Sequence, residues 1–285
     1  MAVLLMSEPP QAVLGTLVNA DGSATYCAPH KSYKIVAGVN YPVEVPYRSD
    51  EIPESTLIEV NLRPHNGVGM VKERHVEELI KRTLQAIVLG EETPRTMLQV
   101  TLQVVSVESD ESLPGGVKGG GQGETYLDLL TSALNAAILG CLDAAVQMRT
   151  LAAAALVGIS SENGAVVTNP GVLQRKNCAS LHVFAFGKDG RTLLMESEGK
   201  FSMESWREAV HAARLAVLGH SVVTDAHAVT GTITNASDVN KHSNGDVAMN
   251  GTDATTGNNS VICVLDVIRR AMEARVIKDE SWRQD

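Results

Sequence analysis

One segment of the chain, residues 97–150, constrains the possible fold more than any other. It opens with a run, 97–105, in which apolar and polar residues alternate, and this pattern predicts a half-buried strand. After a glycine-rich interruption, residues 127–148 carry apolar or small residues at spacings of three and four, which predicts a helix with a buried stripe. The expected stripe comprises Leu127, Leu130, Leu134, Ile138, Cys141 and Ala145. Because Cys141 and Ala145 are small, the helix can approach a neighbouring element closely there.

The same patterns of apolar and polar residues predict strands and helices before and after this segment. The expected strands are a pair within 14–47 around the Asp21-Gly22 turn, then 55–64, 151–157, 165–168, 180–187 and 191–197. A helix is expected at about 72–89, with Gly90 as its C-cap. Ser202 is expected to cap a helix that turns Met203, Trp206, Val210, Ala213 and Val217 inward, and a last helix is expected over 261–276.

Two segments break this pattern. Residues 112–123 contain six glycines and predict a flexible loop, since they do not match the spacing of a phosphate-binding P-loop. Residues 234–260 are polar and almost free of large apolar side chains, which predicts a disordered insertion. We therefore expect a tail over 1–13 and a single domain over 14–285 that includes both segments.

Composition narrows the possible functions. Aromatic residues make up only 4% of the 285 residues, so the core must be aliphatic. The net charge of −9 argues against a protein that binds nucleic acid by itself. The four cysteines and the histidines show no metal-ligand spacing, so we expect reduced thiols, no metal and no cofactor. The apolar start of the chain is too short for a signal peptide or membrane span, so no membrane partner is expected.

An ordered series of short motifs carries a family resemblance. The motifs are DGSA (21–24), LRP (62–64), VKERHVEELIKRTL (71–84), PRT (94–96), LQVV (102–105), LNAAILGCLDAAVQMR (134–149) and LLMESEGKFS (193–202). In this order they resemble the RNase PH family, and within it the ring subunits of the eukaryotic RNA exosome.

The resemblance implies a fold, a set of partners and a location. The implied fold is RNase PH-like, an α+β mixed sheet with helices, related to the topology of ribosomal protein S5 domain 2. The implied partners are other RNase PH-like subunits in a six-membered ring, S1/KH cap subunits, and RNA in the central channel. The implied location is the nucleus and nucleolus, and also the cytoplasm.

The resemblance also implies where a phosphorolytic site would lie. Active members hold phosphate with an arginine before a helix and with the arginine of a Gly-Thr-Arg loop, and use two aspartates on a later hairpin. Lys72 stands at the first arginine position and Tyr126 at the second. The stretch 169–184 should carry the aspartates but contains no acid, and Arg175 and Leu181 stand at those positions.

Four cationic residues are candidates for contact with RNA: Arg63, Lys72, Arg74 and Arg95. The alternative for Lys72 and Arg74 is a solvated helix face paired with Glu73, Glu77 and Glu78. The alternative for Arg63 and Arg95 is that each is a simple surface residue.

The sequence thus predicts a non-catalytic subunit of the exosome core ring that supports 3'-to-5' RNA processing by threading RNA to a nuclease on another subunit. One rival is an active phosphorolytic 3'-to-5' exoribonuclease, which needs residues that are absent here. A second rival is a small-molecule kinase of related topology, which lacks a convincing nucleotide motif.

Overall fold

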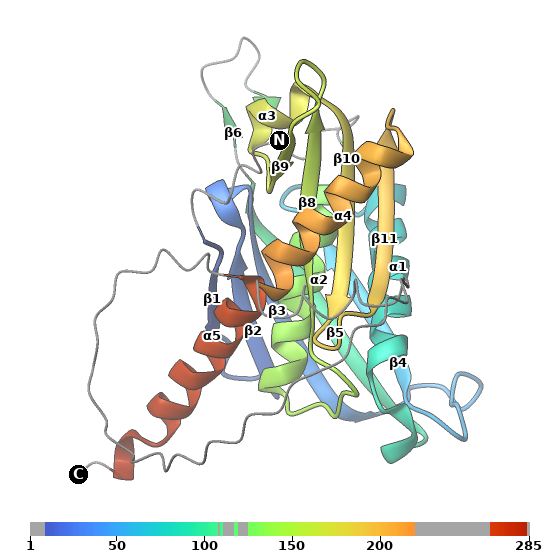
Figure 1. Cartoon of the computed structure of the whole chain (residues 1–285). Coiled ribbons are helices and arrows are strands. Elements are labelled where there is room, and N and C mark those ends of the chain that lie inside the picture. Colours follow the sequence, from blue (N-terminus) through green and yellow to red (C-terminus); the bar gives the residue numbers. More distant parts are fainter. Residues whose placement is uncertain (1–8, 108, 111–116, 119–124, 220–262, 284–285) are drawn as a thin grey trace, which may run out of the picture.

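The computed structural model describes residues 9–107, 109–110, 117–118, 125–219 and 263–283 (Figure 1). The predicted insertion at 234–260 lies outside these residues. The predicted glycine-rich loop does too, except for Val117–Lys118 (β7), which pairs with Ser109–Asp110 (β6). Of the predicted tail, residues 9–13 are described, and the first strand already begins at Gln11.

The first sheet has the strand order β1-β2-β3-β5-β4. Its strands are Gln11–Leu14 (β1), Gly22–Cys27 (β2), Tyr33–Glu44 (β3), Leu57–Arg63 (β4) and Thr96–Val107 (β5). β4 and β5 run parallel and the other neighbours antiparallel, so the predicted mixed sheet is confirmed. The alternation predicted for β5 is confirmed as well, since Leu98, Val100 and Leu102 are fully buried while Gln99 and Thr101 are half-buried.

The second sheet has the order β11-β10-β8-β9 and is antiparallel throughout. Its strands are Ala152–Ser160 (β8), Val166–Thr168 (β9), Cys178–Gly187 (β10) and Thr192–Gly199 (β11). The strands predicted at 180–187 and 191–197 correspond to β10 and β11, which pair antiparallel. β8 is buried on both of its faces up to Ile159, because helices cover the sheet on each side.

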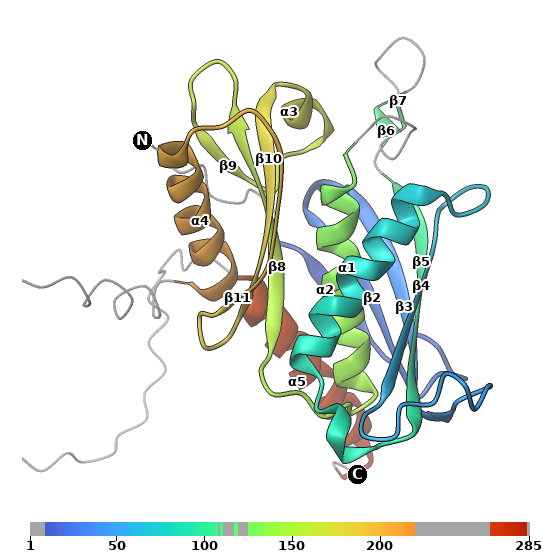
Figure 2. The same cartoon turned by 90° about the vertical axis from the view of Figure 1, so that its right-hand side faces the viewer.

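Helices fill the space between the sheets and cover the second one (Figure 2). They are Val71–Ile87 (α1), Leu127–Asp143 (α2), Val172–Lys176 (α3), Met203–Leu218 (α4) and Val264–Asp279 (α5), with short 3-10 turns at Pro29–Lys31, Gly90–Glu92 and Ser281–Arg283. α2 packs against β2 and β3 on one side and β8 and β10 on the other, with α1 beside it. α4 covers the outer face of β8, β9 and β10. No helix in the described part of the chain is both long and apolar enough to cross a bilayer.

α2 differs from its sequence-based prediction in two respects. All of its residues from Leu127 to Cys141 are buried, so it presents no exposed face opposite the predicted stripe. It also ends at Asp143, and Ala145, which was predicted to lie in the stripe, has a φ of 53° outside the helix. The reason is its position between two sheets, which buries the small residues between the large ones as well.

The structure also corrects two smaller predictions about helices. α1 ends in the extended residue Val88, so Gly90 is not its C-cap and instead begins a 3-10 turn. Ser202 does cap α4, since its hydroxyl accepts a hydrogen bond from the Ser205 amide. However, Met203 is 63% exposed, and small residues such as Ala209 and Ala212 provide much of the buried face of α4.

Candidate functional site

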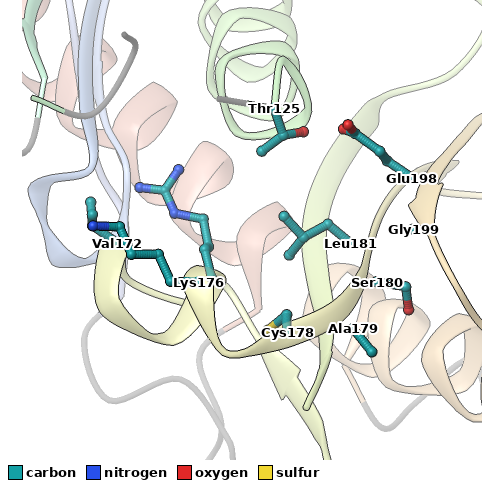
Figure 3. A pocket seen from close by; sticks show the side chains of 10 residues that line it. Thr125, Val172, Lys176, Cys178, Ala179, Ser180, Leu181, Glu198 and Gly199 are labelled. Carbon is teal, nitrogen blue, oxygen red and sulfur yellow. The ribbon is translucent and has the colours of Figure 1, made fainter. Parts of the chain in front are cut away.

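The described residues form a cavity of about 270 Å³ (Figure 3). It lies at the end of the molecule where α2 begins and where Figure 2 shows α3. Its lining comes from three places in the sequence: Thr125 (two residues before α2), the α3–β10 segment and the end of β11. The lining residues are Thr125, Val172, Arg175, Lys176, Cys178, Ala179, Ser180, Leu181, Glu198 and Gly199. Two residues singled out from the sequence, Arg175 and Leu181, therefore lie in one cavity, and a third, Tyr126, directly follows a lining residue.

Tyr126 is the N-cap of α2, but its side chain does not cap the helix. Its hydroxyl donates a hydrogen bond to Glu196 Oε2 at 3.4 Å, and its ring lies edge-on to the His75 ring at a centroid distance of 4.9 Å. Partial burial raises the pKa of Tyr126, and the nearby carboxylates of Glu196 and Glu198 raise it further. At neutral pH the phenol is therefore an uncharged donor of one hydrogen bond.

Arg175 points into the protein and forms an ion pair with Asp128, in the first turn of α2. The Arg175 side chain is 9% exposed and that of Asp128 is 3% exposed, so the pair is buried. The charge of the guanidinium is thus neutralised by a carboxylate of the same chain. An anion in the cavity would compete with that carboxylate for the guanidinium.

Leu181 lies in β10 and its side chain points into the cavity between Thr125 and Cys178 (Figure 3). Together with Leu181, the residues Val172, Cys178 and Ala179 form an apolar floor of the cavity. Burial raises the pKa of the Cys178 thiol. A hydrocarbon side chain offers no lone pair, so Leu181 cannot ligate a metal or transfer a proton. Within the described residues, no group of three or more His, Cys, Asp or Glu side chains is placed to hold a metal ion.

Glu196 and Glu198 were not singled out from the sequence. They stand two residues apart on β11, so their side chains leave the same face of the strand. The Glu198 carboxylate points toward Thr125 across the cavity (Figure 3). The signal in the sequence is that acids alternate at positions 196 and 198 of an expected strand. Both acids belong to the motif LLMESEGKFS, which contributed only to the family resemblance.

The structure divides the four candidate RNA contacts between two ends of the first sheet. Arg63 ends β4, and Lys72 and Arg74 lie in the first turn of α1, which follows it. Arg95 precedes β5, and because β4 and β5 run parallel, it lies at the opposite end of the sheet. Arg95 is paired there with Glu51 at 3.5 Å.

The acidic residues of α1 are engaged in ways that only partly match the alternative of a salt-bridged helix face. Glu78 pairs with Arg82 at 2.9 Å, on the exposed surface. Glu73 instead accepts a hydrogen bond from the Met70 amide, and Glu77 accepts one from the Leu62 amide.

Comparison with known proteins finds a family to which the first half of the chain is similar. Residues 9–147 match the model of the 3' exoribonuclease family, domain 1 (RNase PH). The chain is similar to the exosome complex component RRP46 of Saccharomyces cerevisiae, with 27% identity over 67% of this chain and 82% of the relative. It is also similar to the exosome complex exonuclease RRP46 homolog of Arabidopsis thaliana, with 28% identity over 67% of this chain and 70% of the relative.

Solved structures share the fold. The crystal structure of Rrp46 from rice (Oryza sativa) aligns with a TM-score of 0.60 and 24% identity, over 72% of this chain and 87% of the rice chain. The Archaeoglobus fulgidus exosome with RNA bound to the active site aligns with a TM-score of 0.54 and 13% identity, over 72% of this chain and 84% of the archaeal chain. The predicted RNase PH-like fold is therefore confirmed.

Proposed function

From the premise that this chain carries an RNase PH family domain, we propose that it is a non-catalytic subunit of the core ring of an RNA exosome. The names of its relatives in yeast and Arabidopsis support the exosome, since both are RRP46 proteins of that complex. The ring partners are other RNase PH-like subunits, with S1/KH subunits as the cap, and the complex acts in the nucleus, nucleolus and cytoplasm.

One observation carries the non-catalytic part of the proposal: the chemistry of the residues at and beside the cavity. Where the family resemblance places a phosphate-binding arginine, Tyr126 supplies one neutral hydrogen-bond donor. Where it places two carboxylates, the chain has Leu181 and Arg175, and the charge of Arg175 is neutralised by Asp128. Glu198 adds a negative charge at the cavity, where a bound phosphate would need positive charge.

The magnitude of the deficit argues against residual turnover. Phosphoryl transfer depends on cations and metal ions that neutralise charge developing in the transition state. Removal of one such electrostatic stabiliser lowers kcat by about 10²–10³. The absence of the arginine together with both carboxylates is therefore expected to leave no useful phosphorolysis.

The proposed role of the chain is to complete a ring through which RNA is threaded to a nuclease on another subunit. Arg63, Lys72 and Arg74 gather where β4 ends and α1 begins, and this cationic end of the first sheet suits a phosphate backbone. Charge reversal at these residues in the assembled ring is expected to weaken RNA protection at low salt. Reversal at Arg95 is expected to do less, because Arg95 lies at the other end of the sheet and is paired with Glu51.

A phosphorolysis assay tests the catalytic part. The full chain, purified with its ring partners, is incubated with labelled single-stranded RNA and phosphate, and nucleoside diphosphates are measured. We expect no release above background, and no release from Tyr126→Arg either, because the variant still lacks the carboxylates. Phosphate-dependent release that depends on this chain would overturn the proposal.

The second candidate is an active phosphorolytic exoribonuclease, which the word exonuclease in the name of the Arabidopsis relative favours. It would need a carboxylate near the cavity to serve the reaction, for example Asp128 after release from its ion pair with Arg175. Under this candidate Asp128→Asn abolishes a measurable activity, whereas under the first candidate there is no activity to abolish.

A further inference from the structure

We propose that the cavity beside Tyr126 binds the side chain of a lysine or arginine from a polypeptide partner. The cation would lie at Glu198, and the aliphatic part of the side chain would lie on Leu181 and the residues around it. This inference goes beyond the proposed ring function and does not depend on it, since neither ring assembly nor the absence of phosphorolysis requires the cavity to be filled.

The shape and lining of the cavity suit an aliphatic chain. A volume of about 270 Å³ is enough for one long side chain, and the floor consists of Val172, Cys178, Ala179 and Leu181. In Figure 3 the Leu181 side chain stands in the middle of the lining, with Glu198 and Lys176 on opposite sides of it. A chain of methylene groups can therefore lie over Leu181 while its end reaches Glu198, as long basic side chains do on apolar surfaces.

The charges around the cavity select a cation for that end. Glu198 forms no ion pair with any residue in the described part of the chain, and its carboxylate points across the cavity (Figure 3). Glu196 adds a second carboxylate on the same face of β11, where Tyr126 donates a hydrogen bond to it. One lining cation, Arg175, is neutralised by Asp128.

The same charges disfavour the other classes of ligand. A phosphate or an RNA end would approach two carboxylates, and the only lining cation without a described ion pair is Lys176, an exposed residue on the far rim. A purely apolar side chain would cover Leu181 but would desolvate Glu198 without pairing it. A lysine or arginine side chain can cover Leu181 with its methylene groups and pair its cation with Glu198.

Two small probes that differ only in charge test the proposal. Nα-acetyl-arginine N-methylamide is titrated into the full chain labelled at its leucine and threonine methyl groups, and the signals of Leu181 and Thr125 are followed by NMR. Nα-acetyl-citrulline N-methylamide is the neutral control of nearly the same shape. We expect saturable shifts with a dissociation constant on the order of 1–10 mM for the arginine probe, and roughly two- to five-fold weaker binding of the citrulline probe.

Variants locate the interaction. Glu198→Gln is expected to abolish the preference for arginine over citrulline, while Glu162→Gln, at an exposed acid outside the cavity lining, is expected to keep it. Equal affinity for both probes, no shift with either probe, or shifts of Leu181 with inorganic phosphate instead would overturn the proposal. A failure here leaves the ring function intact, because that function is tested by RNA protection in the assembled ring and by the phosphorolysis assay.

Discussion

The two sides of the cavity hold carboxylates in opposite settings. On the α2–α3 side, Asp128 and Arg175 form a pair whose side chains are 3% and 9% exposed. On the β11 side, Glu198 is exposed and Glu196 is half-buried, and Glu196 has a tyrosine hydroxyl as its partner. On the α2–α3 side the Asp128 carboxylate is buried against its counterion. On the β11 side the Glu198 side chain is exposed to solvent.

Burial, rather than the number of charges, determines whether a carboxylate is important for the stability of the fold or is available to a ligand. A buried ion of a pair becomes strongly destabilising once its partner is removed, because nothing else solvates it. An exposed carboxylate remains solvated and contributes little to stability, but it is available to a ligand. Fold stability and ligand binding are therefore expected to depend on different acids of the same cavity.

The largest effect is expected for the buried pair. Asp128→Asn leaves the Arg175 guanidinium buried without its counterion, so we expect the free energy of unfolding to fall by about 3–5 kcal/mol. Urea titration of the purified full chain measures the change. Glu78→Gln, which breaks the exposed pair with Arg82, serves as the matched control and is expected to change it by less than about 1 kcal/mol.

A double substitution separates the pair from the packing around it. Asp128→Leu with Arg175→Met removes both charges and fills similar space, so we expect it to restore most of the stability that the single variant loses. If the double variant is no more stable than Asp128→Asn, the loss comes from packing and not from an uncompensated buried charge.

Most of the framework was predictable from the sequence, and α2 shows where such prediction fails. Residues such as Leu98 and Val100 alternate along β5, and Ser202 stands directly before α4, so local patterns identify both elements. The burial of Ala133 and Ala136 on α2 is not a local property, because it results from a second sheet that the chain completes later. An alanine at a helical position is compatible with either environment.

The candidate site was predictable only in part, for a related reason. Alignment with family motifs identified Tyr126, Arg175 and Leu181, and the fold places them at one end of α2. It could not identify Asp128 as the counterion of Arg175, because the two residues are 47 positions apart and meet only through tertiary packing. Glu198 was missed because its place in the cavity depends on which face of β11 meets the cavity.

An intermediate effect is expected in the titration of Tyr126. Its pKa is raised above the value in the unfolded chain, so the folded state holds the proton more tightly. That contribution to stability is present below about pH 10 and is lost as the pH rises through the folded pKa. Glu196→Gln is expected to lower the pKa of Tyr126 toward its ordinary value, as measured by the difference in tyrosinate absorbance between each protein and its Tyr126→Phe counterpart. An unchanged pKa would show that the carboxylate does not act on the phenol.

The smallest effect on stability is expected for Glu198. Because this side chain is exposed and has no described ion-pair partner, Glu198→Gln should change the free energy of unfolding by less than about 0.5 kcal/mol. Thermal unfolding of the full chain provides the measurement. A loss comparable to that of Asp128→Asn would erase the distinction between the two sides of the cavity.

The burial of α2 from Leu127 to Cys141 has a consequence for how such a protein changes over generations. From Leu127 to Cys141 every side chain is fixed by neighbours on all sides, and Tyr126 stands just before the helix, where it meets the cavity region. A substitution at position 126 can therefore alter the chemistry at the cavity while the buried residues 127–141 stay the same. Catalysis can be lost, and a new ligand acquired, on a scaffold that keeps its shape.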